Sequence, residues 1–271
     1  MNKLYNEVYG MPMVNIYTDL DKIETENYIL SKKSYRYPKH AIEFMRGGFI
    51  PGDYVVLYSK KRQCVVMSDT PMERYTNQDL IRKAQGDICI LGLGIGMVLF
   101  YLFEEQAERD TDDFFENFDN EEETLAPIKS ITVIEKDKEL IDLIEPLVRN
   151  HTYFKNSGIE LNIIHADAYE YPKTCDKHFD LVYADIWDEY HGYEDEADVF
   201  DELEALYSSI CDDFDGWGYA ASHGHNPDDE SPIETRDYIE WIARMIHHYC
   251  DWDMISKEIM ENITQYIECM A

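Results

Sequence analysis

The chain has 271 residues, of which 45% are hydrophobic, which is enough for one large domain with additions. Its formal net charge of −32 argues against tight binding to a nucleic-acid backbone, because such affinity comes mostly from Lys and Arg. No run of about 18 apolar residues occurs, so we expect no transmembrane helix and no membrane partner. The N-terminus has no apolar segment typical of a signal peptide.

The strong acidity has three interpretations: a heavily solvated surface, attraction of cationic partners or substrates, or DNA mimicry. The cysteines form no Cys-x-x-Cys pair and are scattered along the chain, at Cys64, Cys89, Cys175, Cys211, Cys250 and Cys269. We therefore expect free buried thiols and a cytoplasmic protein, rather than a disulfide or zinc framework.

The N-terminal region, taken as residues 1–85, contains one clear hairpin pattern. Residues 54–58 and 63–67 are β-type runs on either side of a polar turn, so a hairpin is expected over 53–68. The first 50 residues are rich in tyrosine and show a mixed pattern. A short helix is expected at about 77–83, just before the next strand.

The stretch Gly86–Phe100 organises the chain. Residues 88–91 are all apolar without alternation, which is typical of a strand buried on both faces of a parallel sheet. Gly92, Gly94 and Gly96 come next, and glycines allow a tight turn and a close approach of backbone to a ligand. The helix expected after them offers its N-terminal N–H groups to polar or anionic groups.

The glycine spacing favours an adenosyl cofactor over a nicotinamide dinucleotide. The dinucleotide fingerprint is G-x-G-x-x-G, whereas this turn reads G-x-G-x-G and has Met97 where the third dinucleotide glycine belongs. A glycine-rich turn alone also occurs as plain structure, so the interpretation depends on the order of the segments downstream of the turn.

Strand and helix patterns alternate after the turn, which predicts an α/β fold: a Rossmann-like, doubly wound, mostly parallel sheet over residues 86–225. The strands are expected at 131–137, 161–169, 179–188 and 216–222, and a helix at 199–211. The helix after the first of these strands has an apolar face, and Pro146 within it predicts a kink or an early stop.

Two segments stand apart from this alternation. The acidic stretch at about 104–125 carries Phe114, Phe115 and Phe118, and we interpret it as a surface insertion, with a mobile lid as the alternative. Residues 226–271 are expected to form a helical C-terminal extension, because Ser, Pro and Glu give helix-start signals and an apolar stripe comes after them.

Acidic residues stand at the ends of three successive expected strands. Glu135 can accept hydrogen bonds from ribose hydroxyls, and Asp167 can accept from an adenine amino group, with Ala168 leaving room for the ring. Asp185 comes at the end of the strand expected from residue 179, which is the fourth when the strand at 88–91 is counted first. A substrate would meet the cofactor at this place. Each acid alone could simply cap the next helix, but their order after the glycine turn predicts a nucleoside-cofactor site.

This order of motifs resembles the class I S-adenosylmethionine-dependent methyltransferases. The motifs are Cys-Ile-Leu-Gly-Leu-Gly-Ile-Gly, Val-Ile-Glu-Lys-Asp, His-Ala-Asp-Ala and Phe-Asp-Leu-Val-Tyr-Ala-Asp, within about residues 53–222. The chain is most similar to the spermidine synthase-like branch, because Asp185-Ile-Trp-Asp188 matches its D-x-x-D pattern and a β-hairpin precedes the glycine strand. It departs from that branch in lacking the proline after Asp188 and in a loose match over 67–75.

The resemblance implies S-adenosylmethionine, or its decarboxylated form, as the cofactor. Asp185 would be the catalytic base toward an amine, Tyr75 a catalytic residue on the substrate side, and Trp187 and Asp188 substrate-binding residues. Trp187 could equally cover the core. The residues that would bind the cofactor are Gly92, Leu93, Gly94, Gly96, Glu135, Lys136, Asp167, Ala168 and Asp185.

Three functions stand as hypotheses. The first is methyl transfer to a small-molecule or protein acceptor that can carry an amine and a positive charge. The second is aminopropyl transfer from the decarboxylated cofactor, and the third is a non-catalytic acidic interaction module. No metal is expected, because His223 and His225 have no third ligand in view and fit a solvated turn better than a metal or proton-transfer site. A homodimer is an option that the sequence leaves open.

Overall fold

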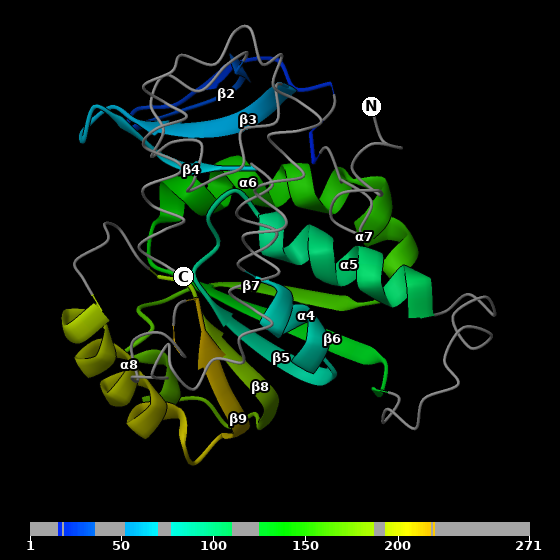
Figure 1. Cartoon of the computed structure of the whole chain (residues 1–271), viewed down its shortest axis with the longest axis vertical. Coiled ribbons are helices and arrows are strands. Elements are labelled where there is room, and N and C mark those ends of the chain that lie inside the picture. The colour runs from blue at the N-terminus through cyan, green and yellow to red at the C-terminus, as the bar shows by residue number, and fades with distance from the viewer. Residues whose placement is uncertain are drawn as a thin grey trace, which may run out of the picture.

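In the computed structural model of the chain, the described residues form two β-sheets, with helices packed around the second of them (Figure 1). The residues that the structure describes are 16–17, 19–35, 52–69, 77–109, 125–186, 193–217 and 219. The acidic insertion is expected at about 104–125, but residues 104–109 continue the helix that begins at Met97, so the insertion does not begin at 104. Residues 110–124 and the expected C-terminal extension lie outside the described residues.

The N-terminal sheet is antiparallel, with four strands in the order β1-β2-β3-β4. The strands are β1 (Ile23–Glu24), β2 (Tyr28–Tyr35), β3 (Gly52–Ser59) and β4 (Cys64–Ser68). The predicted hairpin is confirmed as β3 and β4, and β2 pairs with β3 along its whole length. The first two strands were not predicted, because residues 28–35 do not alternate regularly between polar and apolar.

The second sheet is parallel, in the order β7-β6-β5-β8-β9. Its strands are β5 (Gly86–Leu91), β6 (Ile128–Glu135), β7 (Glu160–His165), β8 (Phe179–Ala184) and β9 (Cys211–Gly216). This confirms the Rossmann-like, doubly wound architecture. The chain moves outward from β5 first to one side and then to the other, so the switch point lies at the carboxyl ends of β5 and β8.

Helices cover both faces of the parallel sheet. They are α4 (Gln78–Lys83), α5 (Met97–Arg109), α6 (Lys138–Asn150), α7 (Thr152–Ser157) and α8 (Tyr193–Tyr207), with a 3-10 turn, η2 (Tyr171–Lys173). Side chains of β5 alternate between the two layers: Ile88 and Ile90 join the core that includes α5 and α6, and Cys89 and Leu91 join the core that includes α8. The central strand is therefore buried on both faces, as its apolar run predicts.

The N-terminal sheet belongs to the same hydrophobic core as α5 and α6. Leu30, Val55 and Leu57 are all buried, and they join the cluster that contains Ile88 and Ile144. Figure 1 shows this sheet (blue and cyan) lying along α6, on the side toward which the parallel strands run. The two sheets are thus joined by packing as well as by chain connection.

Several helix and strand boundaries differ from the prediction. Of the two outcomes expected at Pro146, a kink or an early stop, the early stop is wrong, because α6 continues to Asn150, with Ile144 and Val148 fully buried on its apolar face. Among the described residues the last strand is β9 at 211–216 instead of 216–222, and the helix before it ends at Tyr207 instead of 211. β9 is an edge strand whose Asp212 and Asp213 are exposed, so it lacks the apolar run that marks the inner strands.

The four cysteines in the described residues are free, as predicted. Cys89 is fully buried, but Cys64 is exposed, so the expectation that the thiols are all buried is wrong at that position. Among the described residues, no helix is long and apolar enough to cross a membrane.

Candidate functional site

The carboxyl ends of β5, β6 and β8 bring the glycine turn and two of the predicted acids together. Leu91, the last residue of β5, is paired with Ile134 on one side and Ala184 on the other. The next residues stay connected: the Gly92 N–H donates to the Ile134 carbonyl at 2.9 Å, and the Asp185 N–H donates to the Leu91 carbonyl at 2.8 Å. Glu135 and Asp185 therefore flank the start of the turn.

All three glycines of the turn have positive φ, at 103° for Gly92, 51° for Gly94 and 76° for Gly96. A Cβ on Gly92 would overlap the Asp185 carbonyl oxygen, and a Cβ on Gly96 would lie 2.8 Å from Val148 Cγ2 of α6. These two glycines thus allow β8 and α6 to approach. A Cβ on Gly94 would instead overlap the side chain of Met67, which reaches the turn from β4.

Glu135 is the least exposed of the predicted site acids that the structure describes, with 8% of its surface exposed. Its Oε2 accepts from the Leu93 N–H at 3.0 Å, and its Oε1 accepts from the Asp137 N–H at 2.8 Å. The carboxylate therefore bridges the glycine turn and the start of α6. Each carboxylate oxygen has a second lone pair, so a ribose hydroxyl could still donate to it.

Asp137, two residues later, caps α6. Its Oδ1 accepts from the N–H groups of Glu139 and Leu140 at 2.9 and 3.2 Å, and its Oδ2 accepts from the Tyr28 hydroxyl at 2.7 Å. Burial and the Asp137 carboxylate raise the pKa of Tyr28, which keeps its hydroxyl a donor. Through Asp137, the N-terminal sheet thus reaches the segment just after Glu135.

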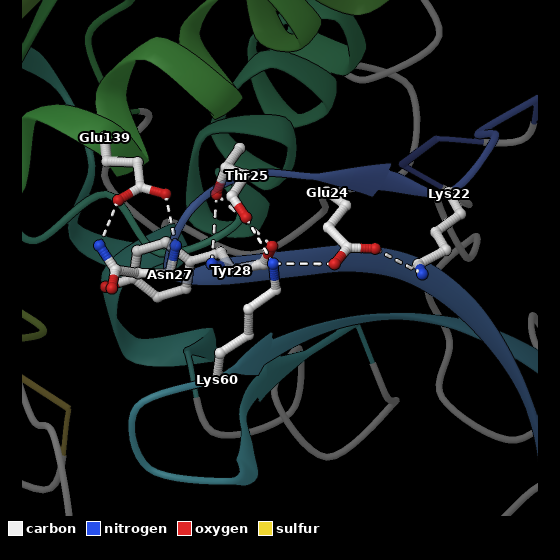
Figure 2. Close-up of polar contacts among 7 residues, drawn as sticks. All are labelled: Lys22, Glu24, Thr25, Asn27, Tyr28, Lys60 and Glu139. Atoms are coloured by element: carbon white, nitrogen blue, oxygen red, sulfur yellow. Dashed lines mark hydrogen bonds and ion pairs between the residues drawn. The ribbon is translucent and has the colours of Figure 1, made fainter.

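Figure 2 shows a second contact between the same two parts of the chain. The backbone N–H and the side-chain Nδ2 of Asn27 donate to the two carboxylate oxygens of Glu139, at 2.8 and 2.5 Å. Lys60 stabilises the loop that carries Asn27. Its Nζ donates to the Thr25 carbonyl at 2.6 Å and lies 2.8 Å from Glu24 Oε1. We call the Asn27–Glu139 and Tyr28–Asp137 contacts the clasp.

Ile95, in the middle of the glycine turn, has both of its backbone polar groups held by N-terminal side chains. Its N–H donates to Met67 Sδ at 3.0 Å, and its carbonyl accepts from the Tyr17 hydroxyl at 2.8 Å. Tyr17 is buried, and burial raises the pKa of its hydroxyl. Neither contact was predicted, because no local pattern around Met67 or Tyr17 indicates it.

Asp185 is half-buried directly after β8. Burial raises the pKa of its carboxyl to about 6. A carboxylate with this pKa is mostly ionised at neutral pH and is more basic than an exposed aspartate, which suits proton removal in a reaction.

Asp167 and Ala168 lie after β7, farther from the turn than Glu135 is. Asp167 is exposed, and its Oδ1 accepts from the Tyr169 N–H at 2.8 Å, which forms a local turn. Asp167 does not cap the next helix, η2, whose N-cap residue is Glu170. Ala168 is buried, and its carbonyl accepts from the Tyr207 hydroxyl at 2.9 Å. The carbonyl of Lys136 lies 3.1 Å from His165 Nε2.

Several predicted site residues lie outside the described residues, namely Tyr75, Trp187, Asp188, His223 and His225. Within the described part of the chain, no group of three or more His, Cys, Asp or Glu is arranged to hold a metal ion.

No protein-family model matches the chain. No curated protein matches it. Among solved structures, the spermidine synthase from Thermotoga maritima is similar at a TM-score of 0.39 and 13% identity, over 85% of this chain and 63% of that one.

Two further solved structures are similar. MNMC2 from Aquifex aeolicus gives a TM-score of 0.36 and 14% identity over 58% of this chain and 54% of that one. An S-adenosylmethionine-dependent methyltransferase from Clostridium acetobutylicum ATCC 824 gives 0.31 and 12% over 51% and 46%. This chain thus spans about half to two thirds of those structures, and the fold assignment rests on strand order and direction.

Proposed function

We propose that the chain is a transferase that binds S-adenosylmethionine at the carboxyl ends of β5, β6 and β8 and transfers its methyl group to an amine-bearing acceptor. One observation carries this proposal: Glu135 and Asp185 flank a turn at the switch point of a parallel sheet, and three glycines with positive φ form that turn. Ligands of open α/β sheets bind at this place.

The residues around the turn fit the cofactor's groups. The Glu135 carboxylate would accept from the ribose hydroxyls with its remaining lone pairs, and Asp167 with Ala168 would face the adenine. Lys136 and Leu93 would contact the cofactor through the segments next to Glu135 and Gly94. The space beside Gly94, where a Cβ would meet the Met67 side chain, is the part of the turn open to a ligand once that side chain moves.

The chemistry asked of the protein is mostly positioning. When bound, the cofactor supplies a methyl group that its sulfonium already activates. Asp185 would accept the proton that the acceptor amine loses as its nitrogen bonds to the methyl carbon, and the raised pKa of Asp185 suits that role. Tyr75, Trp187 and Asp188 are proposed to contact the acceptor, and the net charge of −32 favours a cationic one.

Aminopropyl transfer from decarboxylated S-adenosylmethionine is the second candidate, and one contact favours it. The Ile95 N–H, two residues before α5, would suit the cofactor's carboxylate, but it already donates to Met67. A cofactor without the carboxylate does not need that N–H.

The test begins with calorimetric titration of S-adenosylmethionine, its decarboxylated form and S-adenosylhomocysteine. Polyamines, small amines and lysine peptides are then screened as acceptors. Asp185→Asn should bind the cofactor within a few-fold of the wild type and lose about 10²-fold or more in turnover. Asp180→Asn is the matched control, because it makes the same change at the opposite end of β8.

Two results would contradict the proposal. Wild-type turnover by Asp185→Asn with an active acceptor would remove Asp185 from the catalytic role. Failure of the folded wild type to bind any of the three nucleosides would favour the non-catalytic acidic module.

A further inference from the structure

The Met67 side chain occupies the glycine turn in two ways. Its sulfur accepts the Ile95 N–H at 3.0 Å, and its end fills the space beside Gly94. Met67 comes from β4 of the N-terminal sheet, 28 residues before Ile95. A side chain from outside the parallel sheet thus lies where the proposed cofactor would contact the turn.

The Ile95 N–H is a good donor to an anion. It lies two residues before Met97, the first residue of the 13-residue helix α5, and N–H groups at this end of a helix carry partial positive charge. A methionine sulfur is a weak, neutral acceptor. The Leu93 N–H, by contrast, already donates to the Glu135 carboxylate. An anionic group would therefore bind the Ile95 N–H more strongly than its present partner, the Met67 sulfur, does.

We propose that Met67 is a specificity-determining residue of the cofactor site, because its thioether competes with the carboxylate at the amino-acid end of S-adenosylmethionine for the Ile95 N–H. This inference rests on the proposed function. A nucleoside that lacks the carboxylate binds with Met67 in place, whereas one that carries it must displace Met67. The length and freedom of the methionine side chain permit that displacement, since it is unbranched and has three rotatable bonds.

The charge of the ligand decides the exchange. S-adenosylhomocysteine places its ribose on Glu135 and its carboxylate on the positive end of α5, because the reverse orientation would set two carboxylates against each other. 5′-Methylthioadenosine has the same nucleoside and sulfur without the amino-acid end. Comparing these two ligands isolates the carboxylate and leaves the rest of the site unchanged.

The experiment is calorimetric titration of both ligands into the wild type, Met67→Ala, Met67→Leu and the control Val66→Ala, which shortens the neighbouring side chain of β4. Met67→Ala should bind S-adenosylhomocysteine about tenfold more tightly than the wild type, because both the sulfur and its bulk are gone. Its affinity for 5′-methylthioadenosine should change by less than threefold. Met67→Leu, which keeps bulk without a sulfur acceptor, should fall between, and Val66→Ala should leave both affinities unchanged.

A second measurement follows the Met67 side chain in the wild type and needs one variant, Met67→Leu, only to assign the signal. In protein labelled with ¹³C at the methionine methyl groups, the Met67 signal is the one missing from Met67→Leu. Saturating S-adenosylhomocysteine should shift that signal, and 5′-methylthioadenosine should leave it in place.

The outcomes separate the inference from the proposed function. An unchanged ratio of the two affinities in Met67→Ala, or a Met67 signal that S-adenosylhomocysteine does not move, overturns the inference while cofactor binding stands. Failure of the wild type and all variants to bind either ligand overturns the proposed function and this inference with it.

Discussion

Replacement of Glu135 by Gln separates the structural from the ligand-binding role of this carboxylate. In the folded chain its two oxygens accept from Leu93 and from Asp137. A glutamine keeps one acceptor oxygen and turns an NH₂ group toward the other N–H, so one of the two bonds is lost. Hydrogen bonds to a charged group contribute about 1.5–3 kcal/mol each, so the free energy of unfolding should fall by about that amount.

The same substitution should weaken the binding of S-adenosylhomocysteine. If Glu135 accepts from the ribose, the wild type should prefer this ligand over its 2′-deoxy analogue by tenfold or more, since about 1.4 kcal/mol corresponds to tenfold in affinity. In Glu135→Gln one acceptor oxygen becomes an NH₂ group and the other loses its charge, so a hydrogen bond from the ribose contributes only about 0.5 kcal/mol, the low end for a neutral acceptor. The preference for the parent ligand should therefore fall to within about threefold.

Urea unfolding at an unchanged slope measures the stability loss, and calorimetry with the two ligands measures the preference. Glu139→Gln is the matched control, because it makes the same change four residues later, at the Asn27 contact rather than at the turn. It should leave the ligand preference unchanged. A wild type that does not discriminate against the 2′-deoxy analogue, or a Glu135→Gln variant that still does, would refute the ribose assignment.

Two further predictions concern the N-terminal sheet. Tyr28→Phe removes the hydroxyl that donates to Asp137, so the free energy of unfolding should fall by about 1 kcal/mol, which is less than a fully buried hydrogen bond to a charged group contributes. An unchanged urea midpoint would contradict the role of this bond in the clasp. Asp69, which is 5% exposed, has its carboxyl pKa raised to about 7 by burial, so the folded state holds its proton more tightly than the unfolded state does. The free energy of unfolding of the wild type is then highest below about pH 4, as far as this group decides it. It falls by at most about 4 kcal/mol as the pH rises to 7. Asp69→Asn should accordingly raise the melting temperature relative to the wild type more at pH 8 than at pH 4.5, and an equal difference at both pH values would contradict this.

The features that the sequence predicts correctly are local ones. The unbroken apolar run of β5 and the glycines directly after it indicate a buried strand and a tight turn without any knowledge of the rest of the chain. Acids at strand ends meet at one edge because parallel strands run the same way. The early stop at Pro146 is wrong because tertiary packing of the α6 apolar face outweighs one missing N–H.

The features that the sequence does not predict join distant segments. Tyr28 and Asp137 are 109 residues apart, and Asn27 and Glu139 are 112 residues apart. The Asp137 cap has a recognisable local pattern, but its partner lies in a segment whose strands show no regular alternation. The sequence likewise does not predict the contact of Met67 with Ile95, because a methionine in a strand ordinarily indicates core packing.

The N-terminal sheet contacts the candidate site at two places, and the hydrogen bonds at one place are stronger than those at the other. This difference determines which of the contacts a ligand could break. At α6 the clasp makes three direct hydrogen bonds, each with a carboxylate as acceptor. At the turn, the Tyr17 hydroxyl binds the Ile95 carbonyl, while Met67 contributes one bond to a neutral sulfur. A ligand carboxylate competes for the Ile95 N–H alone and leaves the Tyr17 bond and the clasp intact. The structural response to such a ligand should therefore be a rotation of the Met67 side chain, with the N-terminal sheet remaining docked on α6.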